Sequence, residues 1–455
     1  MNYNTLFSET PPTRLFFKAA LPGSIGMLAS ALYQLIDGMF VGRILGDTAF
    51  AALNLAMPLV IINFALADLV GVGSAVPISI RLGEKNEQEA NNIFTCACLM
   101  VVGSGIICGG ILFAAAPVLI QMMGAQGELA RLAVEYLRVY ALCSPVTTIV
   151  FAVDNYLRIC GKIRGSMLLN VFMSLLSMVL EFLFLYVFRW GIWGASLATC
   201  LGMFICVAVA FYPFMRGKMQ LRFCRPRINK QIIRQIVSCG SPSFLNNIAG
   251  RITSILMNVL LLRMGGETAV SVYGVLMFAD GFIQPLLYGM CDSLQPAVGY
   301  NWGARQYNRV KAIEKRCFSA SAILSLASAV VIFLFPAQIT RLFMQGNDPG
   351  MMQMAVSAMQ IFSFTYITRW FSFACQSFMS AVEKPLYASL ISVSTALIFP
   401  LILIGAFWPL GLTGLWMNFG GTAVLAAILS LVLLLNFKRR FWDKQDKQEP
   451  QSAQK

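Results

Sequence analysis

Long apolar stretches separated by short polar turns run through the whole chain. Each stretch is about 20 residues or longer, which is the length an α-helix needs to cross the hydrocarbon core of a bilayer. Twelve spans are predicted, near residues 15–41, 51–80, 93–118, 132–157, 167–188, 193–214, 236–262, 269–298, 317–335, 352–381, 387–407 and 411–436. The pattern therefore predicts an all-α membrane protein with no separate soluble domain.

Composition and charge agree with that interpretation. Of the 455 residues 58% are hydrophobic and 12% are charged, whereas soluble domains average about 25% charged residues. The net charge is +14, and with the amino terminus inside, the cytoplasmic segments hold 26 of the 34 Lys and Arg residues. The positive-inside rule then predicts a multi-pass protein of the cell membrane with both termini in the cytoplasm, and not a nucleic-acid-binding protein. We expect no removable signal peptide, because the start lacks a short apolar region followed by a cleavage site.

The two halves of the chain repeat each other in one constant register. Positions that match are Pro22 and Pro242, the runs 46–49 and 266–269, Gly83 and Gly303, and Gly191 and Gly411. Each half holds six spans and therefore has the same orientation, so we predict two six-helix bundles related by a pseudo-twofold axis along the membrane normal. The predicted parts are an amino-terminal bundle 1–213, a basic cytoplasmic linker 214–235, a carboxyl-terminal bundle 236–436 and a disordered tail 437–455.

The first half carries ionisable and hydroxyl residues that the second half lacks. Asp37 in span one, Glu181 in span five and Thr199 in span six lie at similar depth, roughly 9–14 Å below the outer surface by helix rise. Ser177 is one turn before Glu181 and shares its face. A charged side chain in hydrocarbon usually pairs, takes up a proton or lines a wet cavity. We predict an oxygen-lined site that shares a proton or, at Asp37, Glu181 and Thr199, binds sodium.

These residues can also be interpreted without any ion-binding or proton-binding role. Asp37 could lie close enough to the surface to be hydrated, Glu181 could reach outward to water, and the hydroxyls of Ser177 and Thr199 could bond to their own helix backbones. In the second half Arg251, Asp280, Asp292 and Arg369 are predicted to form a polar network, with Arg251 paired to Asp280 or with Asp292 and Arg369 sharing that duty. Such a network could be structural or could contact substrate.

Residue types that are absent narrow the chemistry further. The chain has no histidine, which removes imidazole bases and imidazole metal ligands. No GxxxxGK loop is present, so ATP is not expected to be the energy source. The twelve cysteines include no CxxC pair and are interpreted as small apolar residues. A carrier that needs no cofactor fits these observations better than an intramembrane enzyme or a channel does.

Four stretches resemble the multidrug and toxic compound extrusion (MATE) family of cation-coupled antiporters. They are VGRILGDTAFAALNLAMP, GVGSAVPISIRLGEKNEQEA, LEFLFLYVFRWGIWGASLAT and LQPAVGYNWGARQYNRVK. In that family an acid in the first span, an Asn and an Asp one turn apart in the fifth and a Thr in the sixth form the cation site. Asp37, Ser177, Glu181 and Thr199 match those positions, and the resemblance favours the branch whose site is in the amino-terminal half.

Two of the four positions depart from the family pattern, because Ser177 replaces an Asn and Glu181 replaces an Asp. Loss of the amide favours protons over sodium as the coupling ion. The resemblance implies an antiporter, functional as a monomer among membrane lipids, that exports amphipathic and often cationic small molecules. The alternative is a lipid-linked oligosaccharide or lipid flippase of related fold, for which Arg251 and Arg369 would supply a basic cavity.

Overall fold

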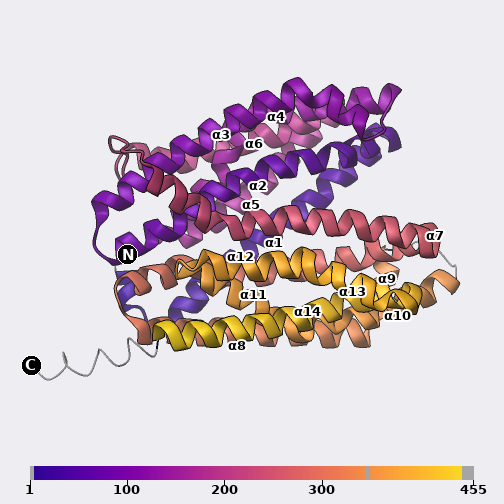
Figure 1. Ribbon diagram of the computed structural model, residues 1–455. Coiled ribbons are helices and arrows are strands. Elements are labelled where there is room, and N and C mark those ends of the chain that lie inside the picture. Colours follow the sequence, from indigo (N-terminus) through magenta and orange to yellow (C-terminus); the bar gives the residue numbers. More distant parts are fainter. Residues whose placement is uncertain (1–4, 344–348, 443–455) are drawn as a thin grey trace, which may run out of the picture. The chain divides into compact units, whose positions relative to one another are not determined.

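The computed structural model describes residues 5–343 and 349–442, and these residues are almost entirely helical (Figure 1). The helices of the first half are α1 (Pro12–Leu45), α2 (Asp47–Gly83), α3 (Glu87–Met122), α4 (Gly127–Ile159), α5 (Ile163–Phe182) with a π-helical extension (Leu183–Val187), and α6 (Ile192–Met215). Those of the second half are α7 (Lys230–Gly303), α8 (Tyr307–Leu334), α9 (Pro336–Phe343), α10 (Pro349–Ser363), α11 (Thr365–Ala381), α12 (Pro385–Val393), α13 (Phe399–Phe407) and α14 (Gly411–Phe437). A short π-helix (Ser394–Ile398) joins α12 to α13, others lie at Thr5–Glu9 and Lys438–Trp442, and a 3-10 turn (Trp408–Leu410) precedes α14.

All twelve predicted spans are confirmed as helical segments, with three differences in how they are divided. Spans seven and eight form the single element α7, which is interrupted only at Gly266. Span ten is split into α10 and α11 beside Phe364, and span eleven comprises α12, its π-helical turn and α13. The predicted disordered tail beyond residue 442 lies outside the described residues.

The backbone repeats its unusual conformations in the register found in the sequence. Gly46 between α1 and α2 has φ 90°, and Gly266 within α7 has φ 65°. Lys85 (φ 61°) and Arg305 (φ 58°) match in the same register and follow α2 and α7. Residues that carry a side chain rarely adopt positive φ, so a positive φ marks a particular kind of turn. The two halves therefore make the same tight turns at equivalent places.

The described chain forms two compact units. Unit 1 comprises Met1–Ile248, Gln284–Arg316 and Ser380–Pro385, and unit 2 comprises Ala249–Ile283, Cys317–Met379 and Leu386–Lys455. Unit 1 thus includes the end of α7, the start of α8 and the turn after α11 in addition to the first six helices. The predicted bundle boundaries at 213 and 236 stay a prediction.

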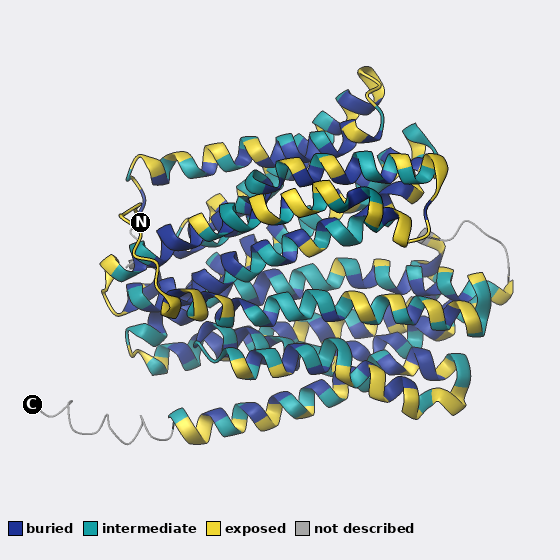
Figure 2. Cartoon of the chain, turned by 45° about the horizontal axis from the view of Figure 1, so that its top comes forward, coloured by how far each residue is buried: buried dark blue, intermediate teal, exposed yellow. Residues whose placement is uncertain are grey.

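Each unit has its own apolar core. In unit 1 the core includes Val41, Leu53, Tyr136, Leu185 and Ile192, from α1, α2, α4, the extension of α5 and α6. In unit 2 it includes Leu261, Leu276, Phe362, Tyr366 and Trp416. Figure 2 shows exposed turns spaced along the same helices that carry buried ones. Many exposed side chains are large and apolar, as a protein surrounded by lipid requires.

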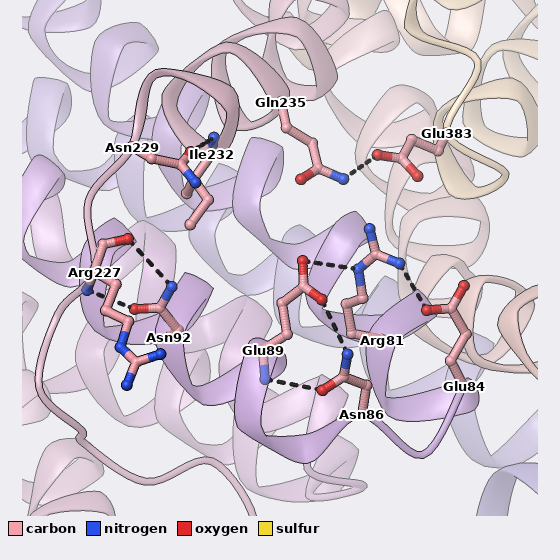
Figure 3. Close-up of polar contacts among 10 residues, drawn as sticks. All are labelled: Arg81, Glu84, Asn86, Glu89, Asn92, Arg227, Asn229, Ile232, Gln235 and Glu383. Carbon is pink, nitrogen blue, oxygen red and sulfur yellow. Dashed lines mark hydrogen bonds and ion pairs between the residues drawn. The ribbon is translucent and has the colours of Figure 1, made fainter.

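The linker between α6 and α7 is bound along the beginning of α3, within unit 1. The side chain of Asn92 accepts from the backbone N–H of Arg227 at 2.8 Å and donates to its carbonyl at 3.3 Å (Figure 3). Asn91 accepts from the backbone N–H of Arg222, also at 2.8 Å. Side chains of α3 thus replace the hydrogen bonds that this extended segment does not make to itself.

A second set of polar contacts joins neighbouring turns of unit 1 close to that linker (Figure 3). Arg81 at the end of α2 forms ion pairs with Glu84 (2.7 Å) and Glu89 (3.5 Å). Gln235 of α7 donates a hydrogen bond to Glu383 in the turn after α11. This turn is assigned to unit 1 although α11 itself is not.

Candidate cation-coupling site

Asp37 and Glu181 come together inside unit 1. Asp37 lies on α1 and Glu181 near the end of α5, and their exposures are 3% and 0%. The two carboxyl groups lie close enough to interact directly with each other. Three of their oxygens, Asp37 Oδ1 and both Glu181 oxygens, receive no hydrogen bond from the described residues. Ionised carboxyls only accept, so a bond between the two needs a proton on one of them. The pair can therefore hold a shared proton or a cation.

Thr199 lies beside this pair but bonds to other groups. Its hydroxyl is 2.6 Å from the hydroxyl of Tyr33 on α1 and 3.4 Å from the carbonyl of Ala195 on its own helix. Tyr140 of α4 lies in the same region and acts electrostatically with Asp37. The expected bond from the hydroxyl to its own helix backbone is present, and the Tyr33 hydroxyl adds a second contact. Thr199 thus links α1 and α6 beside the acids.

Ser177 is buried one turn before Glu181 and packs against Gly202 of α6. A Cβ placed on Gly202 would lie 2.3 Å from Ser177 Oγ and 3.3 Å from its Cα. Only a glycine allows α5 and α6 to approach this closely. Ser177 thus directs its oxygen toward α6 at a position where the family pattern has an amide.

The sequence interpretation missed Tyr33 and Tyr140. Tyr33 is four residues before Asp37 and therefore on the same face of α1, so helical spacing could have identified it. No spacing connects Tyr140 to the acids, because it lies on a different helix. The π-helical turn Leu183–Val187 begins two residues after Glu181, and such turns are frequent at functional sites.

The polar network of unit 2 differs from the predicted one. Asp280 of α7 forms an ion pair with Arg369 of α11, with Oδ1 2.9 Å from Nη1, and Tyr366 donates a hydrogen bond to the same carboxylate. The predicted pairing of Arg251 with Asp280 is therefore wrong. Arg369 is preferred because its guanidinium lies beside both the carboxylate and the ring of Tyr366.

Arg251 and Asp292 lie outside this ion pair. Arg251 is exposed on α7, and none of the described acids forms an ion pair with it. Asp292 belongs to unit 1, not unit 2, because the end of α7 packs there. It accepts a hydrogen bond from Gln295 at 2.8 Å and acts electrostatically on Asp68 of α2. Asp292 and Asp280 thus belong to different units.

A buried ion pair in unit 1 also escaped the sequence interpretation. Asp154 and Arg158 are four residues apart on α4 and pair at 2.5 Å. Ser166 and Asn170 of α5 donate to Asp154, and Arg158 Nε donates to Ser166 at 3.0 Å. Their spacing was a usable signal, since acids and bases at i and i+4 meet on a helix. Every charge in this cluster has a partner, so it is structural in character.

The MatE family matches the chain twice, at residues 22–183 and 242–404. The two matches begin at Pro22 and Pro242, which are equivalent positions of the sequence repeat. The chain belongs to the MatE family. Members of the MatE family are membrane transporters and not enzymes, so the resemblance seen in the four sequence stretches is confirmed.

Curated relatives align with this MatE protein over nearly its whole length. It is 23% identical over 437 residues to the multidrug export protein MepA of Staphylococcus aureus strain N315, covering 94% of this chain and 95% of that protein. MepA of Staphylococcus saprophyticus is also 23% identical, over 431 residues.

Solved MATE structures share its fold. A MATE crystallised in complex with MaL6 superposes with a TM-score of 0.90 at 23% identity, covering 96% of this chain and 99% of that one. An outward-facing multidrug resistance MATE transporter of the MOP superfamily gives 0.88 with the same coverage. The all-α fold with twelve membrane spans in two six-helix bundles is thereby confirmed.

Proposed function

We propose that this MatE protein is a secondary antiporter that exports amphipathic, often cationic, small molecules across the cell membrane in exchange for protons. The distribution of Lys and Arg supports cytoplasmic termini. The family assignment supports transport. The relatives named as multidrug export proteins support a broad range of drug-like substrates. Carriers with two repeats of the same orientation transport by alternating access to a central site.

The observation that carries the coupling proposal is the buried pair of Asp37 and Glu181. Two carboxylates without a base cannot both remain ionised in a low-dielectric site, because desolvation and mutual repulsion both oppose it. A proton that binds to the pair neutralises one carboxylate, which lowers both the desolvation cost and the repulsion between the two acids. When the proton leaves, both costs return. The pair therefore changes the balance of charge on α1 and α5 whenever it loads or releases a proton.

The surroundings of the pair favour a proton over sodium. A metal ion needs several oxygens held around it at once. Here the Thr199 hydroxyl is engaged with Tyr33 and Ala195, and Ser177 lies against Gly202. Of the four predicted site residues, only the two acids keep oxygens without a donor, and two carboxyls suffice to share a proton. A sodium ion at Asp37, Glu181 and Thr199 would require Thr199 to exchange partners.

The flippase alternative loses support from the same structure. A lipid pyrophosphate would need several uncompensated cations, whereas Arg369 is already paired with Asp280. Arg251 alone carries too little positive charge to bind a pyrophosphate.

Proton coupling is tested with purified full-length protein in vesicles, by measuring efflux of a cationic dye under a pH gradient in sodium-free buffer. We expect efflux by the wild type and at most weak substitution by a sodium gradient. Glu181→Asp combined with Ser177→Asn restores the family pattern of the site and should make sodium more effective. A wild type that is inactive without sodium would show that the coupling ion is wrong.

A further inference from the structure

Arg251 lies in the middle of a membrane span without a counter-charge among the described residues. It lies about 22 Å along the helix from the break at Gly266, and equally far from Ile236, where the apolar part of α7 begins. An arginine at this depth is costly unless it is paired or faces water. Its side chain is nevertheless exposed, and no described acid pairs with it.

The acid that could have neutralised Arg251 is already occupied. Asp280 holds Arg369 and accepts from Tyr366, which balances its charge within unit 2. Tyr273 lies in the electrostatic range of both Asp280 and Arg251. The excess positive charge of this region therefore belongs to Arg251.

The side of α7 that carries Arg251 is polar along one edge. Ser254 and Asn258 follow at helical spacing, and the hydroxyl of Ser254 is 3.4 Å from that of Tyr273. Ile252, Ile255 and Val259 form an adjoining exposed apolar stripe suited to lipid, and Ile255, four residues after Arg251, lies where the stripe meets the polar edge.

Two glycines of α7 have open space at their Cβ positions. A Cβ added to Gly250 or Gly274 would meet no atom within 4 Å. No described side chain packs against α7 at these two positions, which are sequence neighbours of Arg251 and Tyr273.

We propose that Arg251, with the hydroxyls of Tyr273 and Ser254, binds an anionic group of a transported molecule, such as a carboxylate or sulfonate. A guanidinium presents several donors in a fixed fork that suits such groups. The inference rests on the proposed export function and extends its substrates from plain cations to zwitterionic amphiphiles. A lipid phosphate is a poorer occupant, because headgroups lie at the membrane surfaces and Arg251 lies near mid-span.

The test compares two probes that differ in a single charge. One is a rhodamine dye with a free carboxylate, and the other is its methyl ester, a plain cation. Fluorescence anisotropy measures their binding to the purified full-length protein in phosphatidylcholine nanodiscs. We expect Arg251→Gln to raise the Kd of the acid dye about tenfold or more, as for loss of a charged hydrogen bond, and to leave the Kd of the ester unchanged.

Two further substitutions make the result specific. Arg251→Lys keeps the charge but loses the fork, so it should weaken the acid dye less than Arg251→Gln does. Arg263→Gln removes an exposed arginine further along α7, close to the break at Gly266, and should change neither Kd. Equal weakening of acid and ester by Arg251→Gln, or no weakening of either, overturns the proposal.

Two measurements on the wild type remain decisive if a variant does not fold. An aliphatic sulfonate should displace the acid dye and not the ester, and failure to compete contradicts the site. Adding phosphatidylglycerol to the nanodiscs should not displace the acid dye, because displacement would assign Arg251 to a lipid headgroup. Binding needs no gradient, so proton-driven efflux of the ester separately tests the proposed function.

Discussion

Two groups of buried acids, one in each unit, have opposite surroundings. In unit 1, Asp37 and Glu181 face each other, and three of their oxygens receive no donor from the described residues. In unit 2, Asp280 receives the guanidinium of Arg369 and the hydroxyl of Tyr366. The acids of unit 1 need a proton or a cation from solution to neutralise their charge. The charge of Asp280 is already neutralised by Arg369.

This difference separates a site that can change state from one that holds a structure. A paired and hydrogen-bonded acid has no reason to exchange protons, and its loss leaves a buried charge without a partner. Two buried acids with no basic side chain beside them are stabilised when a proton binds, because their mutual repulsion falls. Proton-dependent movement is therefore expected from α1 and α5 and not from the contact between α7 and α11.

The largest effect should come from breaking the acid pair itself. Asp37→Asn removes the charge while keeping the shape, so we expect proton-driven dye efflux to fall to the level of protein-free vesicles, with normal membrane insertion. The matched control is Asp47→Asn, which removes an exposed acid at the start of α2 and should retain wild-type efflux. Wild-type efflux by Asp37→Asn would show that the acid pair of unit 1 is not the coupling site.

Unit 2 should respond in stability. Asp280→Asn or Arg369→Gln alone breaks this partly buried ion pair and should cost ~3–5 kcal/mol, whereas the double substitution should cost less than the sum. The readout is thermal unfolding in detergent. The control cycle pairs Asp280→Asn with Arg251→Gln, which do not form an ion pair and should be nearly additive. Additivity in the Asp280–Arg369 cycle would contradict the observed pair.

Much of the fold could be predicted because the membrane restricts the possible structures. Every backbone polar group must be satisfied inside the bilayer, so a long apolar segment is a helix. The repeat was also readable, since the turns at Gly46 and Gly266 need the same positive φ. The division of span ten at Phe364 was not predicted, because no proline or glycine marks it.

The polar contacts between helices were harder to predict. Depth along a helix suggested that Asp37 and Glu181 could meet, and the structure places them together. The same argument put Arg251 and Asp280 at one level, yet Asp280 contacts Arg369. Depth is set by residue number, whereas the direction of a side chain depends on helix rotation, which one sequence does not determine. Contacts within one helix, such as Asp154 with Arg158, are the exception.

A smaller effect is expected where α5 and α6 approach each other. Gly202→Ala places a methyl group 2.3 Å from Ser177 Oγ, so the helices must separate or Ser177 must turn, at ~1–3 kcal/mol. Ser177→Ala in the same chain removes the oxygen and should restore part of the thermal stability. Gly103→Ala on α3 is the matched control, since a Cβ there meets nothing within 4 Å. Equal stability of the Gly202 and Gly103 variants would show that the close contact is absent.

The smallest effect should come from the hydroxyls beside the acid pair. Tyr33 and Thr199 bond to each other at 2.6 Å, so Tyr33→Phe removes one buried hydrogen bond and should cost about 1 kcal/mol of stability. Thr199→Val should cost a similar amount, and the double variant should cost less than the sum, because both changes remove one interaction. Export should continue on a proton gradient in all three, since the acids keep their own contact. If Tyr33→Phe stops efflux as completely as Asp37→Asn does, the tyrosine acts on the coupling ion, and the acid pair is not sufficient alone. If only Thr199→Val stops it, Thr199 is a ligand, and sodium becomes the better assignment.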